Sequence, residues 1–273
     1  MNLFIRQYKE TEEIYLRARY YQPAVGRFLT RDTYTGEEDD PLSLHLYGYC
    51  GNDGVNQLDP TGHKAKAIPV AKGAPKYEPK KWNKESVRIR TNCYAYAFNF
   101  KKNPITKQNF GTGRNSIFAM QPGMFCGQQY NSEDFITKEG VIDRVEKDMK
   151  KLKYKFKPIS NKKVYKKITN KRSWLVYLVV TKKGKTEEKT KNNIICLDGA
   201  DYHWYRQDKS GKWSHKPGNS KVTRKDAKGK IIKNPSKADK KYCYKNSYRG
   251  ITIIENIKYE NVGFFKVTKK KKG

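Results

Sequence analysis

The chain has 273 residues and a formal net charge of +32, with 36% hydrophobic and 13% aromatic residues. This aromatic content argues against a wholly disordered protein. The longest apolar run, Trp174–Val180, is too short to cross a membrane as a helix. The N-terminus lacks the apolar stretch of a secretory signal peptide, so we expect that any export depends on an address elsewhere.

Charge divides the sequence into two parts. The first 63 residues hold six basic and ten acidic residues, whereas the remaining 210 hold 53 basic and 17 acidic residues. Between them, residues 64–81 contain three prolines, one glycine and six lysines, which is typical of a linker. We therefore predict an acidic segment over 1–63 and a basic domain over 82–273. The positive charge fits an anionic partner, either nucleic acid or bacterial wall polymer, or alternatively a soluble lysine-rich surface.

The five cysteines form no C-x-x-C pair and have no zinc-like spacing with the four histidines. We therefore predict no metal site and no cofactor. The spacing leaves the disulfide state of Cys126, Cys196 and Cys243 open.

Residues 15–63 are short aromatic runs separated by closely spaced turn residues, a pattern that predicts short strands and tight turns. Several pieces of this segment closely resemble the end of the Rhs, or YD-repeat, core. They are YLRARYY (15–21), GRF (26–28), LYGY (46–49), GND (51–53) and VNQLDPTG (55–62).

The resemblance implies that residues 1–63 are the last strands of a repeat shell and that the basic domain is the toxin tip. Rhs proteins are large secreted or surface-displayed bacterial toxins, in which Asp-Pro-x-Gly marks the border of the toxin. We accordingly expect a fragment of a larger parent protein that supplies the rest of the shell and acts in or on a target cell. A cognate immunity protein, with an acidic face against the basic domain, is the expected partner.

Some Rhs relatives cut themselves beyond this border with a pair of aspartates, because two carboxylates that share a proton suit peptide hydrolysis. Asp32 and Asp59 occupy comparable places. Asp32 is not followed by proline, however, and His63 stands where those relatives have leucine. We expect turn-forming aspartates, with self-cleavage as the alternative.

After the linker, a helix is predicted to begin at Cys93. Thr91 or Asn92 is a suitable N-cap, and the apolar residues that follow have helical spacing. In the first turn of a helix, backbone N–H groups and the helix dipole favour a thiolate, so we expect a lowered pKa for Cys93. The alternative is a buried structural cysteine.

The sequence from 201 to 218 predicts a β-hairpin that turns at Ser210–Gly211. His203 begins the first strand, and His215 lies near the end of the second. This turn places His203 opposite Gly218, so that His215 is a diagonal neighbour of His203. The other predicted elements are a helix over 139–150, a central buried strand over 174–180, a turn over 182–185, strands over 194–197, 251–254 and 264–267, and a loop over 242–249.

The order of a helix-start cysteine, a strand-start histidine and a polar residue on the next strand is similar to papain-like hydrolases, most of all to NlpC-type cell-wall peptidases. The resemblance implies an α+β domain with the cysteine helix packed on an antiparallel sheet. It makes Cys93 the nucleophile, His203 the general base and acid, and His215 the orienting residue. Asn92 is a candidate oxyanion donor by adjacency. The usual Asp-Cys-Ser-Gly is replaced here by the sequence Asn-Cys-Tyr-Ala at 92–95.

We therefore expect a cysteine-dependent hydrolase, either a peptidase, an amidase or a deamidase, that acts on a wall peptide or a target protein. The first alternative is a nuclease toxin in which His203 or His215 is the acid or base at a phosphate and lysines hold the backbone. The second is a module that binds wall polymer without catalysis. A metal held by the two histidines lacks a third ligand at a recognisable spacing.

Overall fold

The computed structural model describes residues 6–8, 12–33, 35, 44–50, 59, 68–112, 120–128, 135–161, 163–181, 189–191, 194–248 and 251–270. The chain divides into two compact units, Met1–Ala67 and Ile68–Gly273, called here the N-terminal and C-terminal units. Within the described ranges, every helix is too short or too polar to cross a membrane.

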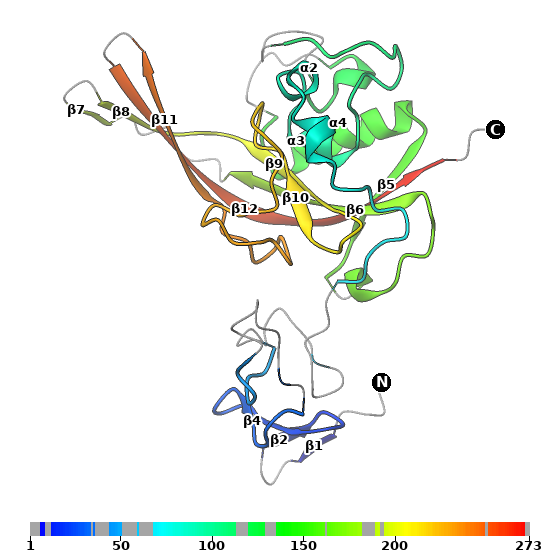
Figure 1. The fold of residues 1–273 in the computed structure, drawn as a ribbon, viewed down its shortest axis with the longest axis vertical. Helices are drawn as coiled ribbons and strands as arrows, with labels where there is room; N and C mark the ends of the chain where they lie inside the picture. Colours follow the sequence, from blue (N-terminus) through cyan, green and yellow to red (C-terminus); the bar gives the residue numbers. More distant parts are fainter. Residues whose placement is uncertain are drawn as a thin grey trace. The chain divides into compact units, whose positions relative to one another are not determined.

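The N-terminal unit is a small antiparallel sheet, as the turn-rich sequence predicted (Figure 1). Its strands follow one another in chain order, and its small core contains Leu16, Phe28, Tyr49 and Cys50. The strands are β1 (Arg6–Tyr8), β2 (Glu13–Tyr15), β3 (Tyr20–Gln22) and β4 (Arg27–Phe28).

The C-terminal unit is α+β, as predicted, and is organised by one long strand. β12 (Ile251–Lys269) pairs over its second half with β6 on one side and β5 on the other, and over its first half with β11 and β8. Beyond β6 the sheet continues through β9 to β10, and beyond β8 to β7. All these pairs are antiparallel except β8 with β12. The other strands are β5 (Tyr154–Ile159), β6 (Ser173–Thr181), β7 (Lys189–Lys191), β8 (Ile194–Asp198), β9 (Tyr202–Gln207), β10 (Trp213–His215) and β11 (Lys241–Tyr248).

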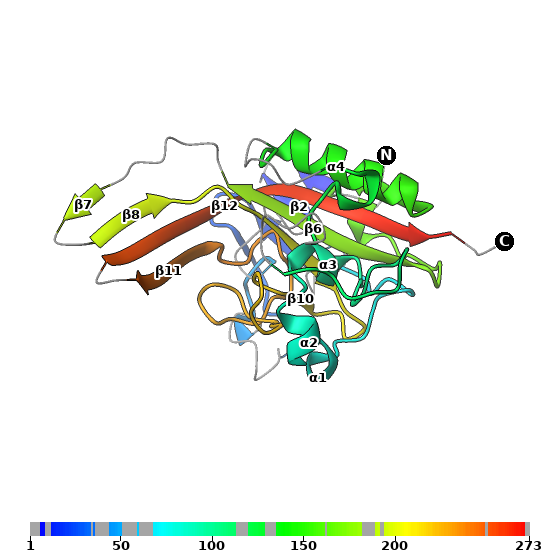
Figure 2. The same ribbon diagram turned by 90° about the horizontal axis from the view of Figure 1, so that it is seen from above.

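The first half of β12 runs with β7, β8 and β11 out of the body as an arm (Figures 1 and 2). The prediction of a loop over 242–249 is therefore wrong, because residues 241–248 form β11. The strands predicted at 251–254 and 264–267 are confirmed as parts of a single strand. Its middle lacks the continuous apolar run on which the prediction relied, but it has the alternation of a strand, since buried Ile257 and Tyr259 alternate with exposed Lys258 and Glu260.

Two helices pack on one face of the sheet (Figure 1). α3 (Cys93–Ala97) is a single turn. α4 (Lys138–Lys151) confirms the predicted second helix: Thr137 caps its N-terminus, and Val141, Val145 and Met149 face the core. The remaining helices are α1 (Pro79–Trp82), α2 (Glu85–Arg88) and the 3-10 turns Met124–Cys126 and Lys163–Tyr165.

β6 is the central buried strand that its apolar run predicted. Every residue of β6 is buried, since Val176 and Leu178 join the core under the helices while Leu175 and Tyr177 join a second core on the opposite face. Ile68, Val164 and Ile232, from segments between the strands, also belong to that second core. The predicted strand at 194–197 is confirmed by β8, and the turn predicted over 182–185 lies outside the described residues.

Part of the proline- and lysine-rich segment packs onto the C-terminal unit. Ile68, Ala71 and Ala74 are buried. The Gln207 side chain at the end of β9 accepts from the Ala71 N–H and donates to the carbonyls of Ile68 and Pro69. This buried glutamine fixes the segment against the sheet, a tertiary contact that composition does not indicate.

Candidate functional site

A cleft of about 290 Å³ opens where the start of α3 meets the start of β9. This volume suits a small chemical group or the side chain of a larger substrate. Cys93 and His203, the candidate nucleophile and the candidate base from the sequence, both line this cleft. Further lining residues are Arg90, Asn92, Gln121, Asp201 and Asn219.

Cys93 is the first residue of α3, and Asn92 is its N-cap, as predicted. The Asn92 side chain accepts from the Ala95 N–H at 3.1 Å, and its Nδ2 donates to the Met120 carbonyl at 2.5 Å. Both ends of this carboxamide thus serve the fold, by capping the helix and by holding residue 120 beside it. A role for Asn92 as an oxyanion donor stays a prediction.

The Cys93 thiol lies against the strand that carries His203. Its Sγ donates to the carbonyl of Tyr202 at 3.8 Å, and the backbone N–H of Trp204 also interacts with it. Tyr202 and Trp204 are the two neighbours of His203 in β9. The sulfur is therefore placed at the edge of β9, level with the histidine.

Burial raises the pKa of Cys93 above its ordinary value, and the nearby Asp201 acts in the same direction. The backbone N–H groups of Trp204 and Tyr94 and the Lys216 ammonium oppose this effect. The prediction of a lowered pKa is therefore wrong for the resting protein. The physical reason is that α3 has only five residues and a small dipole, whereas the thiol is only 5% exposed.

His203 and His215 are joined directly. His203 Nε2 lies 2.7 Å from His215 Nδ1, and His215 Nε2 lies 2.8 Å from the Lys225 carbonyl oxygen. His215 is opposite Tyr205, so it is the predicted diagonal neighbour of His203, with a register one residue away from the predicted one. The diagonal position brings the two rings together because both side chains point to the same face of the hairpin.

The Lys225 carbonyl, which ends this chain of hydrogen bonds, determines where the protons of the two rings lie. A carbonyl oxygen only accepts, so His215 Nε2 carries a hydrogen and donates to Lys225. Burial lowers the pKa of His215 to about 4, and that of His203 well below its ordinary value, so both rings are neutral at neutral pH. His215 Nδ1 then accepts from His203 Nε2–H, and His203 Nδ1 has a lone pair for a proton from the cleft.

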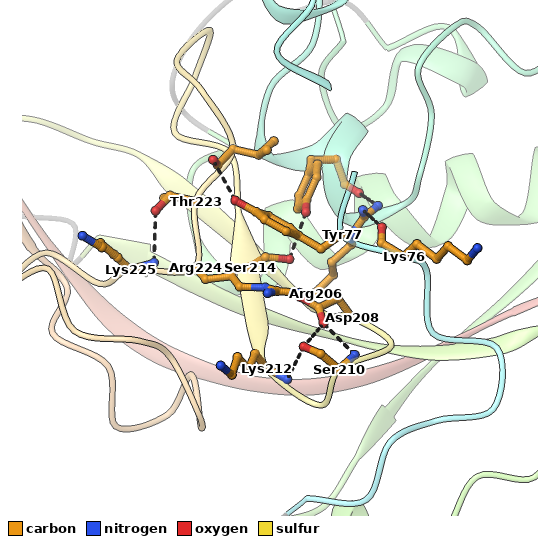
Figure 3. Close-up of polar contacts among 12 residues, drawn as sticks. Lys76, Tyr77, Arg206, Asp208, Ser210, Lys212, Ser214, Thr223, Arg224 and Lys225 are labelled. Atoms are coloured by element: carbon orange, nitrogen blue, oxygen red, sulfur yellow. Dashed lines mark hydrogen bonds and ion pairs between the residues drawn. The ribbon is translucent and has the colours of Figure 1, made fainter. Parts of the chain in front are cut away.

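A buried arginine fastens α3 to the hairpin (Figure 3). Arg206 Nη1 donates to the Tyr96 carbonyl at 2.8 Å and to Asn99 Oδ1 at 3.1 Å, and Nη2 donates to the Lys76 carbonyl at 3.2 Å. The hydroxyls of Tyr96 and Ser214 form a second bond, 2.9 Å long, between α3 and β10. Sequence reasoning missed Arg206, although strand alternation from Trp204 places it on the helix side of β9.

Within the parts of the chain that the structure describes, no group of three or more His, Cys, Asp or Glu side chains could hold a metal ion. In these parts Cys93, Cys126 and Cys243 are free thiols.

The two aspartates of the N-terminal unit meet at one arginine. Arg19 Nη2 lies 2.7 Å from an Asp32 oxygen and 3.8 Å from an Asp59 oxygen, and the Arg19 side chain is buried. The turn pattern did not indicate this ion-pair cluster. A role in self-cleavage stays a prediction.

The chain is 44% identical over 55 residues to the tRNA nuclease WapA of Bacillus subtilis (strain 168) and, over the same length, to the tRNA3(Ser)-specific nuclease WapA of Bacillus spizizenii. Each match covers 20% of this chain and 2% of the nuclease. It is also 26% identical over 172 residues to the insoluble matrix shell protein 1 of Ruditapes philippinarum, which is 60% of this chain and 81% of that protein. No family model and no solved structure matches.

The two kinds of match cover different amounts of the C-terminal unit. Fifty-five residues leave most of the unit from Ile68 to Gly273 without a counterpart in the nucleases. The match to the shell protein is longer than the N-terminal unit, so it includes part of the C-terminal unit.

Proposed function

We propose that the C-terminal unit is a cysteine-dependent hydrolase or acyl-transfer enzyme and forms the tip of an Rhs-type toxin. The observation that supports this most is the hydrogen-bond chain from the Lys225 carbonyl through His215 to His203, a residue that lines the same cleft as Cys93. This is the division of labour that nucleophilic catalysis requires.

In this mechanism the thiol and imidazole start as neutral groups. His203 Nδ1 takes the proton from Cys93 as Sγ attacks a carbonyl carbon, and the resulting imidazolium returns the proton to the leaving nitrogen. His215 keeps His203 in the tautomer whose Nδ1 can accept. Because burial raises the pKa of Cys93, proton transfer has to accompany attack rather than precede it.

Gln121 is better placed than Asn92 to stabilise the oxyanion. It lines the cleft, and its Oε1 accepts from the Tyr202 hydroxyl at 2.6 Å. With Oε1 engaged in this way, the Nε2 hydrogens are the free donors of the carboxamide. An amide donor beside the attacked carbonyl is the usual means of stabilising a tetrahedral intermediate.

A nuclease is the second candidate. Taken alone, the comparisons favour it over the hydrolase, because two of the named relatives are tRNA nucleases. The excess of lysine fits a phosphate backbone. In this alternative His203 Nδ1 is the base at the phosphate. His215 is less suited as a separate acid, because both of its ring nitrogens are engaged inside the protein.

The toxin context comes from the Rhs resemblance. It comprises delivery by a larger parent protein, a cognate immunity protein and a target cell. These three elements belong to the proposal together with the enzyme activity.

The experiment compares the wild type with Cys93→Ala and His203→Ala for growth inhibition inside bacterial cells, digestion of peptidoglycan and degradation of tRNA. Cys243→Ala, which removes an exposed free thiol, is the matched control. The hydrolase predicts that Cys93→Ala and His203→Ala abolish growth inhibition while Cys243→Ala retains it. Degradation of tRNA that survives Cys93→Ala but not His203→Ala would replace the hydrolase with the nuclease.

A further inference from the structure

Lys216 follows the last residue of β10 and is completely buried. Its Nζ donates to three backbone carbonyls, those of Arg88 at 2.8 Å, Thr91 at 2.5 Å and Gly218 at 2.6 Å. Three acceptors match the three N–H groups of the ammonium form, whereas a neutral amine has only two. The hydrogen bonds thus favour a positive charge inside the C-terminal unit, against burial, which lowers the pKa of Lys216 from 10.5 to about 7.

This charge has no carboxylate partner among the ion pairs of the described residues. The three carbonyl dipoles solvate the ammonium without cancelling its charge. Buried lysines are uncommon unless they are paired, so the place of this one in the fold is informative.

Lys216 also connects the two sides of the cleft. Thr91 and Gly218, which both supply carbonyls to it, line the cleft, and Thr91 lies two residues before Cys93. Lys216 and Asp201 are charged groups that act on the thiol, and Arg88 acts on Lys216. The hydroxyls of Tyr205, Tyr244 and Tyr259 are titratable groups that also interact with it. Lys216 is the group in this set that favours the thiolate.

We infer that Lys216 is a positioning residue for the Cys93 nucleophile. Its three hydrogen bonds fix the segment before α3 against the segment after β10, and its charge stabilises the negative charge that develops on Sγ as His203 takes the proton. The inference rests on the proposed function, because it gives this developing charge a role in catalysis.

The test measures the thiol directly and needs no substrate. The rate of iodoacetamide alkylation of the Cys93 peptide is followed by mass spectrometry as a function of pH, in the wild type and in Lys216→Met. Loss of the charge should move the profile to higher pH and reduce the rate at neutral pH by about tenfold, which corresponds to one pH unit. Lys216→Gln is the second variant, because its amide still donates to the carbonyls without a charge.

Lys240 offers a matched control. It is also buried and donates to two backbone carbonyls, those of Ser236 and Ala238, but it is not part of the cleft lining. Lys240→Met should leave the Cys93 profile unchanged. A folded Lys216→Met or Lys216→Gln protein with the wild-type profile would reduce Lys216 to a structural residue, and so would failure of both variants to fold. A shifted profile in a protein without hydrolase activity would count against the proposed function alone.

Discussion

The two units of this chain each bury a positive charge, and they surround it with different groups. In the N-terminal unit, Arg19 lies between the carboxylates of Asp32 and Asp59. In the C-terminal unit, Lys216 and Arg206 are bound by backbone carbonyls, with one side-chain amide on Arg206. Carboxylates cancel a charge, whereas carbonyl dipoles solvate it and leave its field in place.

This difference separates a structural cation from one that acts on its surroundings. The Arg19 cluster joins segments of the N-terminal unit that are up to 40 positions apart, and its cation lies directly against carboxylates. The charge of Lys216 instead acts on the Cys93 thiol and lowers its pKa, against the effect of burial.

Removal of Arg19 should have the largest effect on stability. Arg19→Met removes the buried guanidinium that lies against two buried carboxylates, and this should lower the unfolding free energy of the N-terminal unit by about 3 to 5 kcal/mol. All four tryptophans, at positions 82, 174, 204 and 213, lie in the C-terminal unit. Hydrogen exchange of N-terminal peptides is therefore the measurement. Arg27→Met, which removes an exposed guanidinium from β4, is the control, and equal protection in both variants would contradict the prediction.

Acid should weaken the C-terminal unit by adding charge to the histidine pair. Burial lowers the pKa of His215 from its ordinary 6.5 to about 4, so the folded state binds this proton less readily than the unfolded state. The corresponding stability is fully present above about pH 6.5 and is lost as the pH falls towards 4. The loss amounts to about 3 kcal/mol.

Urea unfolding followed by tryptophan fluorescence at pH 7.5 and pH 4.5 measures this loss. His215→Asn should flatten the dependence on pH, because the titrating ring is removed. An identical slope in the variant and the wild type would show that other groups carry the acid sensitivity.

A single neutral hydrogen bond between α3 and β10 should matter less than either charge effect. Ser214→Ala removes the partner of the buried Tyr96 hydroxyl and should cost about 1 kcal/mol of unfolding free energy. Since Arg206 still holds α3, the alkylation profile of Cys93 should stay unchanged. Fluorescence-detected urea unfolding gives the first quantity, and a shifted alkylation profile would mean that Ser214, too, positions the nucleophile.

The elements that the sequence predicted correctly are those with local signals. Asn92 before an apolar helical spacing, the apolar run of β6 and the turn of the β9–β10 hairpin each occupy a short stretch of chain. Buried charges are different, because their partners are distant in sequence: Lys216 binds carbonyls about 125 positions earlier. A lysine or an arginine in a basic sequence is predicted to face solvent, and only the tertiary structure shows which ones do not.

The smallest effect is expected where a charge pair faces water. Lys147 and Asp143, one helical turn apart on α4, lie 2.7 Å apart with more than half of each side chain exposed. Solvent screens the pair, so Lys147→Ala should lower the unfolding free energy by only about 0.3 to 0.5 kcal/mol and less at high salt. Fluorescence-detected urea unfolding in low and high salt measures this, and Lys151→Ala, on the same helix, corrects for the change in helix propensity. A loss of several kcal/mol would mean that ion pairs on this basic surface contribute far more than solvent-exposed pairs usually do. The contrast between buried and exposed cations in the C-terminal unit would then disappear.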